Sequence, residues 1–140
     1  MANENLSRPF LIEFNGQFVV NPRPTDDMAF EGRIPASTGD RRDAAVFKLE
    51  NGFLLKADSG PMPLHFGRFR IEPLALMPMP VYWIPQRDMV QQCAYIGEES
   101  SPETFQSSGF HMGVLPGQEN LVRAMPPGLF PGSEMKLHWQ

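Results

Sequence analysis

The chain has 140 residues, of which 41% are hydrophobic and 20% charged, and its formal net charge at pH 7 is −4. This length is enough for one domain with a core of its own. The acidic balance argues against nucleic acid as the main partner, because phosphate binding needs a basic surface. The 15 prolines and 12 glycines favour a loop-rich all-β fold over a helical bundle.

The N-terminal residues lack a basic stretch followed by an apolar one, so we expect no signal peptide. No apolar run reaches the ~20 residues that a membrane-spanning helix needs. The single cysteine, Cys93, rules out a disulfide within the chain and a cysteine-based metal site. We therefore expect a cytoplasmic protein with no membrane span.

The first predicted strands lie in residues 10–20, where an Asn-Gly pair separates two apolar runs. A two-residue turn at Asn15 and Gly16 would place Glu13 on the face of Phe18. A three-residue loop ending in Gly16 keeps one face apolar, and it is therefore the expected register. An uninterrupted strand with a bulge at Gly16 fits the alternation equally well.

The clearest alternation covers residues 45–57, where the odd positions are mostly apolar and several even positions are charged. A hairpin with a loop at residues 50–52 pairs Leu49 with Phe53 and puts the apolar side chains on one face. Gly52 then occupies the loop position that favours positive φ. We expect this hairpin to contribute one apolar face to the core.

The longest apolar stretch covers residues 69–85, which carry no charge after Glu72. Its prolines exclude a helix and a fully paired central strand. We expect an amphipathic strand at 69–72, irregular chain at 74–80 and a second strand at 81–84. Neighbouring residues on a strand point to opposite faces, so only one of the two aromatic residues in the second strand can point inward.

The C-terminal half contains further predicted strands. Residues 88–96 fit a helix and a strand about equally, and the all-β context favours the strand. A Ser-Pro start predicts one helical turn at 100–105. Strands are expected at 110–115, at 121–125 and at 135–139, and the last must pair with a sheet to avoid fraying.

These elements together predict a small antiparallel β-barrel of about eight strands with at most one short helix. A β-sandwich is the alternative architecture, because the same short strands and turns build both. No repeat of fixed period occurs in the sequence, which argues against a propeller. The whole chain is expected to form a single domain.

The three histidines lie far apart in the sequence and lack the close spacing typical of a metal site. We therefore expect no metal and no cofactor. For each histidine the first interpretation is a ring bonded to backbone, and the second is acid–base catalysis. Cys93 has no catalytic motif around it, which favours a buried thiol over a nucleophile.

Soft apolar side chains are abundant: 9 Met, 11 Phe, 2 Trp and 2 Tyr. Met suits an irregular apolar ligand, and Tyr and Trp add polar groups to apolar walls. We therefore predict a ligand cavity in the barrel mouth. Its predicted substrate-binding residues are Phe69, Met77, Met79, Trp83, Tyr95 and Met112. Its predicted catalytic residues are His65, Arg70, Glu72, Tyr82 and His111.

Two functions from different classes fit this sequence. The first is a cofactor-independent cyclase or isomerase that holds a polyketide-, terpenoid- or lipid-like substrate in a reactive conformer, an effect that contributes roughly 7–11 kcal/mol at best. In expected architecture it resembles the small cofactor-free barrel cyclases of natural-product pathways, a likeness of fold alone. The second is a non-enzymatic binding module whose Met/Pro/aromatic strip forms a homodimer interface.

Overall fold

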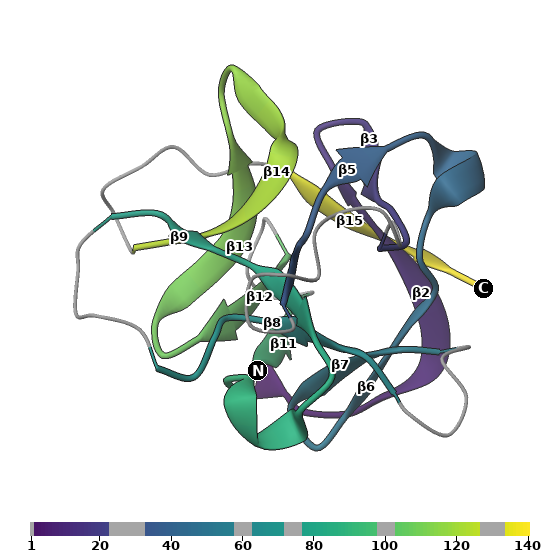
Figure 1. The fold of residues 1–140 in the computed structure, drawn as a ribbon. Helices are drawn as coiled ribbons and strands as arrows, with labels where there is room; N and C mark the ends of the chain where they lie inside the picture. Colours follow the sequence, from purple (N-terminus) through teal and green to yellow (C-terminus); the bar gives the residue numbers. More distant parts are fainter. Residues whose placement is uncertain (1, 23–32, 58–62, 72–76, 98–102, 127–133) are drawn as a thin grey trace.

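A computed structural model describes residues 2–22, 33–57, 63–71, 77–97, 103–126 and 134–140. Within these residues the chain is all-β, as predicted, with fifteen strands and two three-residue 3-10 turns (Figure 1). The strands outnumber the predicted eight because many contain only two or three residues. None of the helical turns in the described ranges is long and apolar enough to cross a membrane.

The larger of two antiparallel sheets contains nine strands. They are β2 (Leu6–Phe14), β3 (Gln17–Val19), β4 (Ile34–Pro35), β5 (Thr38–Gly39), β6 (Phe47–Glu50), β7 (Phe53–Lys56), β8 (His65–Gly67), β10 (Tyr82–Ile84) and β15 (Met135–Trp139). Their order is β4-β10-β8-β7-β6-β2-β3-β5, and β15 pairs with β2. Pairing of the last strand with β2 confirms the prediction that a sheet holds it.

The smaller sheet contains six strands. They are β1 (Ala2–Asn3), β9 (Met79–Pro80), β11 (Ala94–Ile96), β12 (Thr104–Ser107), β13 (Phe110–Leu115) and β14 (Gln118–Met125). Their order is β1-β11-β12-β13-β14-β9. The two 3-10 turns are η1 (Arg41–Asp43) and η2 (Arg87–Met89).

A strongly curled antiparallel sheet forms a half-barrel (Figure 1). Residues 36 and 37, between β4 and β5, connect the two sheets through backbone contacts. The backbone N–H of Ala36 donates to the carbonyl of Val81 at 2.8 Å, and the N–H of Val122 donates to the carbonyl of Ala36 at 3.1 Å. Ser37 forms a bridge with Leu121 of β14. Paired edges of this kind leave fewer backbone groups exposed at the sheet margins.

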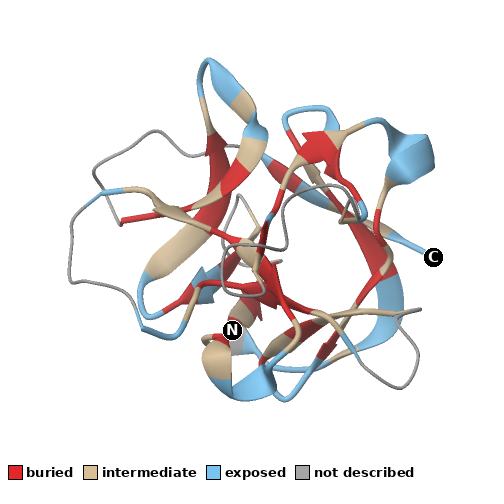
Figure 2. Ribbon diagram, in the orientation of Figure 1, coloured by how far each residue is buried: buried red, intermediate tan, exposed pale blue. Residues whose placement is uncertain are grey.

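Aromatic side chains from both sheets pack together in one core. Figure 2 shows buried residues on strands of both sheets. Phe47 stacks on Trp83 with ring centroids 5.4 Å apart and meets Phe66 edge-on at 5.1 Å. Phe10 lies 5.9 Å from Phe105 of the smaller sheet. All five side chains are at most 1% exposed. Burial of each such side chain stabilises the fold by roughly 1.5–3 kcal/mol, so the two sheets share one core.

The expected register of the first hairpin is wrong. Asn15 and Gly16 have φ values of 49° and 88°, which form a two-residue type I′ turn whose twist matches that of the strands. Glu13 therefore pairs with Phe18. His138 of β15 compensates for this placement, because its Nε2 lies 2.7 Å from the Glu13 carboxylate. The apolar alternation could not reveal this neighbour from the end of the chain.

The second hairpin forms where predicted, but its register is also wrong by one residue. Asn51 and Gly52 have φ values of 52° and 81°, so this turn too has two residues and pairs Glu50 with Phe53. Because side chains alternate along a strand, the shift moves Phe53 and Leu55 away from the face of the core. Both side chains are half-buried on the outer face of the sheet.

Three local predictions in the middle of the chain have mixed outcomes. The strand expected at 69–72 is wrong over its described part, where Phe69 makes a single bridge to Val90. The strand expected at 81–84 is confirmed as β10. The strand favoured for residues 88–96 is confirmed only at 94–96, as β11, because the segment begins in η2; a helix over the whole segment is excluded.

The helical turn expected at 100–105 is wrong at residues 104 and 105, which belong to β12. Residues 100–102 lie outside the described ranges. The strands expected at 110–115 and 121–125 are confirmed within β13 and β14.

Candidate functional site

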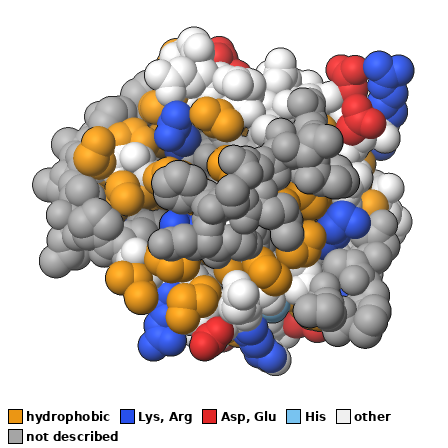
Figure 3. Space-filling model, viewed as in Figure 1, with side chains coloured by type: hydrophobic (Ala, Val, Ile, Leu, Met, Phe, Trp, Pro, Cys, Tyr) orange, Lys and Arg blue, Asp and Glu red, His pale blue; other side chains and the backbone are white. Residues whose placement is uncertain are grey.

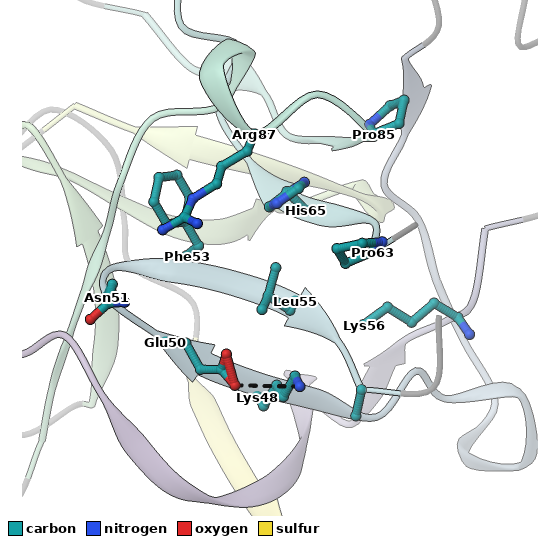
Figure 4. A pocket seen from close by; sticks show the side chains of 11 residues that line it. Lys48, Glu50, Asn51, Phe53, Leu55, Lys56, Pro63, His65, Pro85 and Arg87 are labelled. Carbon is teal, nitrogen blue, oxygen red and sulfur yellow. Dashed lines mark ion pairs between the residues drawn. The ribbon is translucent and has the colours of Figure 1, made fainter. Parts of the chain in front are cut away.

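A hollow of about 500 Å³ lies on the outer face of the larger sheet, over β6, β7 and β8 (Figure 4). Its lining combines apolar side chains, three cationic side chains, one carboxylate and one imidazole. The lining residues are Lys48, Glu50, Asn51, Phe53, Leu55, Lys56, Ala57, Pro63, His65, Pro85 and Arg87. We call it the His65 hollow.

Strand register explains how these side chains come together. Leu55 of β7 pairs with Lys48 of β6 on one side and with His65 of β8 on the other. In the next row, Phe53 pairs with Glu50. Directly paired residues of antiparallel strands point to the same face with their Cβ atoms about 5 Å apart. The hollow therefore depends on the two-residue turn that the second hairpin adopts.

The His65 ring interacts with the backbone carbonyl groups of Ile84 and Pro85. Its Nδ1 lies 3.0 Å from the carbonyl oxygen of Ile84. A carbonyl can only accept, so Nδ1 carries the hydrogen, and Nε2 of the neutral ring keeps its lone pair. Burial lowers the pKa of His65, and the charge of Arg87 lowers it further, against the opposing effect of the backbone bonds. The ring is therefore a neutral base at pH 7.

Arg87 extends from η2 over the apolar floor of the hollow (Figure 4). Its guanidinium carbon lies 4.5 Å from the ring centroid of Phe53, within the range of a cation–π contact. Phe53 in turn meets the His65 ring edge-on, with centroids 5.9 Å apart. The contact with Phe53 thus holds a permanent positive charge close to the imidazole.

The charges around the hollow favour an anion. Among the described lining residues, Lys48, Lys56 and Arg87 are cationic and Glu50 is the one acidic side chain. The Glu50 carboxylate lies 3.3 Å from the Lys48 ammonium group, and both side chains are about half exposed. Such an exposed pair contributes little to stability. Phe53 and Leu55 form the apolar part of the same surface, so the lining suits a molecule with an apolar body and an anionic group.

Searches against protein-family models, curated proteins and solved structures each return no match to this chain. Function must therefore be argued from the geometry of the chain itself.

Of the predicted site residues, His65 lines the hollow, and three others lie in the core. Trp83 is 1% exposed, and its indole nitrogen has no hydrogen-bond partner among the described residues. The Tyr95 hydroxyl donates to the Glu103 carboxylate at 2.8 Å. Met112 is 3% exposed within the hydrophobic cluster. The structure does not bring these core residues together with His65 in one cavity.

The remaining predicted residues lie nearer the surface. Arg70 is exposed and donates to the Asp88 carbonyl at 3.1 Å. Phe69 and Tyr82 both lie against the guanidinium of Arg33, at 3.8 and 4.9 Å from the ring centroids. None of these three predicted residues is among those that line the His65 hollow.

Of the last four predicted positions, the three described ones do not line the hollow. Met77 is 55% exposed, and Met79 is half-buried in β9. His111 is half-buried in β13, where burial lowers its pKa. Glu72 lies outside the described residues.

Sequence reasoning missed most of the hollow, including Phe53, Leu55 and Arg87. The Asn51-Gly52 pair was the available signal, because a two-residue turn would have placed Phe53 and Leu55 on the outer face. Arg87 had no local signal, since its contact with Phe53 depends on how distant segments pack.

Neither a metal centre nor a reactive thiol emerges from the described part of the chain. Within those ranges no group of three or more His, Cys, Asp or Glu side chains lies close enough to hold a metal ion. Cys93 is buried, and burial raises the pKa of its thiol to about 12. A thiol in that environment stays protonated at neutral pH and is a poor nucleophile.

Proposed function

We propose that the chain binds a small amphipathic anion in the His65 hollow and that His65 acts on it as a general base. The observation that carries this proposal is the fixed tautomer of His65, whose Nδ1 is bonded to the Ile84 carbonyl. A neutral imidazole with a defined basic nitrogen, next to a permanent cation, is suited to proton transfer.

The chemistry needs no cofactor. Nε2 of His65 takes a proton from a carbon next to a carbonyl group, and the electron pair of the broken C–H bond moves to the carbonyl oxygen. Arg87 stabilises the negative charge that develops there. Return of the proton from Nε2 to a different atom completes an isomerisation. In a cyclisation the carbanion attacks a second carbonyl group of the same molecule, and the oxygen of that group takes the proton back from Nε2. General base catalysis of this kind contributes about 10²–10⁴-fold in rate.

The substrate class follows from the lining. Phe53, Leu55 and the two prolines suit an apolar body, while Arg87 suits a carboxylate or enolate oxygen. A polyketide- or lipid-like acid has both parts. The proposal keeps the cofactor-independent isomerase or cyclase expected from the sequence and moves its site from the barrel mouth to the outer face.

Calorimetric titration with hexanoate tests the proposal. We expect hexanoate to bind the wild-type chain and to bind Arg87→Met roughly tenfold or more weakly, because a charged hydrogen bond is lost. Arg42→Met is the matched control, since the Arg42 side chain is 83% exposed in η1 and is not among the residues that line the hollow. No binding to wild type, or an equal loss in both variants, would refute the proposal.

A homodimer interface is the second candidate function. Ile71 is 70% exposed and Met77 is 55% exposed, and hydrophobic side chains gather on the face shown in Figure 3. Exposed apolar side chains of this size gain free energy when a second copy covers them. Sedimentation velocity should then give a dimer that Met77→Lys dissociates. A wild-type monomer at high concentration would refute this candidate.

A further inference from the structure

We infer that the His65 hollow is the head-group end of a longer site and that its ligand is a single-chain amphiphile with an anionic head group. The apolar tail of this ligand crosses the Lys48–Glu50 pair into a second hollow on the same face of the sheet. This inference rests on the proposed function, because it requires an anion beside His65 and Arg87.

The second hollow has a volume of about 480 Å³ and lies over β2 and β6. Its lining residues are Asn5, Leu6, Ser7, Arg8, Pro9, Lys48, Leu49 and Glu50. We call it the Leu6 hollow. Lys48 and Glu50 line both hollows, so the two spaces are neighbours that share one wall.

An irregularity in strand pairing creates the Leu6 hollow. Leu6 pairs with Leu49 and Phe10 pairs with Phe47, and the register shifts between these two pairs. Three residues of β2, at positions 7–9, therefore lie opposite the single residue Lys48 of β6. A bulge of this kind interrupts the ladder and bends the strand. The interruption leaves space between two strands that would otherwise be in contact.

The two hollows differ in polarity, which sets the direction of the ligand. Half-buried Leu6, Pro9 and the methylene stem of Lys48 give the Leu6 hollow its apolar surface, while the Leu49 side chain points into the core. The His65 hollow holds the imidazole and Arg87 at its far end. An anionic head group is therefore favoured beside Arg87, and an apolar tail is favoured beside Leu6.

The wall between the hollows can be crossed by an alkyl chain. The Lys48–Glu50 pair lies across the His65 hollow from His65 and Arg87 (Figure 4). The pair is about half exposed, so its displacement costs little. The methylene stem of Lys48 offers apolar contact to a passing chain while its ammonium group stays in water.

Titration with two fatty acids tests the inference. We expect tetradecanoate, kept below its micelle concentration, to bind wild type roughly sixtyfold more tightly than hexanoate. Three additional buried methylene groups supply this gain at about fourfold each. Dodecyltrimethylammonium carries the opposite head charge and should not bind in the same range.

Ser7→Trp fills the Leu6 hollow from an exposed position of β2. We expect this variant to bind hexanoate with the affinity of wild type. It should lose most of the additional affinity that wild type has for tetradecanoate over hexanoate. Gln106→Trp is the matched control, because Gln106 is exposed in β12 and lines neither hollow. Gln106→Trp should keep the full difference in affinity between tetradecanoate and hexanoate.

A measurement on the wild-type chain makes the test independent of the variant's folding. Tetradecanoate should shift the amide resonances of Asn5 and Ser7, and hexanoate should leave them unchanged. Equal affinities for the two acids, with hexanoate bound, would overturn the Leu6 hollow while leaving the proposed function intact. Binding of neither acid would overturn both. Retention on phosphatidylglycerol vesicles without binding of monomeric tetradecanoate would instead indicate a membrane surface and overturn the inference.

Discussion

The two faces of β6, β7 and β8 are made by the same three strands but differ in almost every property. The inner face carries Phe47, Leu54 and Phe66, each at most 1% exposed and packed against other apolar groups. The outer face carries Phe53 and His65 beneath Arg87. A hydrophobic side chain thus contributes to the core or to a binding surface according to strand parity alone. The Asn51-Gly52 turn sets that parity.

The largest expected difference between the faces is in stability. Phe47→Ala should lower the free energy of unfolding by about 3–5 kcal/mol, because it leaves a cavity in a packed core. Phe53→Ala removes a half-buried side chain and should cost less than half as much. Urea denaturation of both variants measures this contrast. Equal losses would mean that the outer face is packed like the core.

The turn that sets the register can be tested at Gly52. Gly52→Ala should destabilise the fold by about 1–2 kcal/mol, because φ is +81° and the new Cβ would lie 3.1 Å from the Cβ of Gln92. Gly109 is the matched control, because its φ is +82° and a Cβ added there would meet no atom within 4 Å beyond its chain neighbours. Gly109→Ala should cost about 1 kcal/mol from backbone strain alone. Thermal unfolding of the two variants should rank them in that order.

Local patterns predicted where most strands lie, and they failed on how the strands are paired. Alternation in residues 135–139 identified β15, and the parity of Tyr82 and Trp83 showed that only one of them could enter the core. The same alternation placed Phe53 on the wrong face of the sheet, because sequence alone does not distinguish an apolar side chain on the outer face from one in the core. At both Asn-Gly pairs, the preference of these residues for a two-residue turn set the strand register. The register that would keep all apolar side chains on one face did not form.

The site was less predictable than the fold because its parts are not local. His65 was a candidate from its residue type, but its fixed tautomer depends on the Ile84 carbonyl of another strand. Arg87 belongs to a 3-10 turn whose position over Phe53 follows from packing of the whole sheet. Glu13 and His138 show the same limit, since a contact between the two ends of a chain leaves no trace in either segment.

The buried imidazole predicts a pH dependence of stability. The folded-state pKa of His65 is below its ordinary value of 6.5, so the folded state binds fewer protons than the unfolded state between those two pKa values. Stability is fully present above about pH 6.5 and falls as the pH drops through the lower pKa of the folded state. Chemical denaturation between pH 7.5 and 5 should show this fall, and His65→Gln should reduce it.

His111 must be separated from His65 in that experiment. Its pKa is also lowered by burial, so its contribution has the same sign. His111→Gln should therefore remove a second part of the pH dependence, and the double variant should show the least. A pH profile that neither substitution changes would contradict the burial of both rings.

The smallest effect is expected at Cys93, on the core side of the fold. Because burial raises the pKa of its thiol to about 12, the folded chain should not react with a thiol-specific disulfide reagent at pH 8 over minutes. The chain unfolded in urea should react at once. Rapid reaction of the folded chain would show that this part of the core opens to solvent.

The central claim is that a neutral His65, with its proton on Nδ1, faces a binding hollow for anions. Nitrogen NMR of the imidazole measures the tautomer directly and can be repeated with hexanoate present. The account predicts a protonated Nδ1 and an unprotonated Nε2 at pH 7, with the Nε2 resonance of His65 shifting as hexanoate binds. A proton on Nε2, or a His65 resonance that hexanoate leaves unchanged while it binds elsewhere, would contradict it.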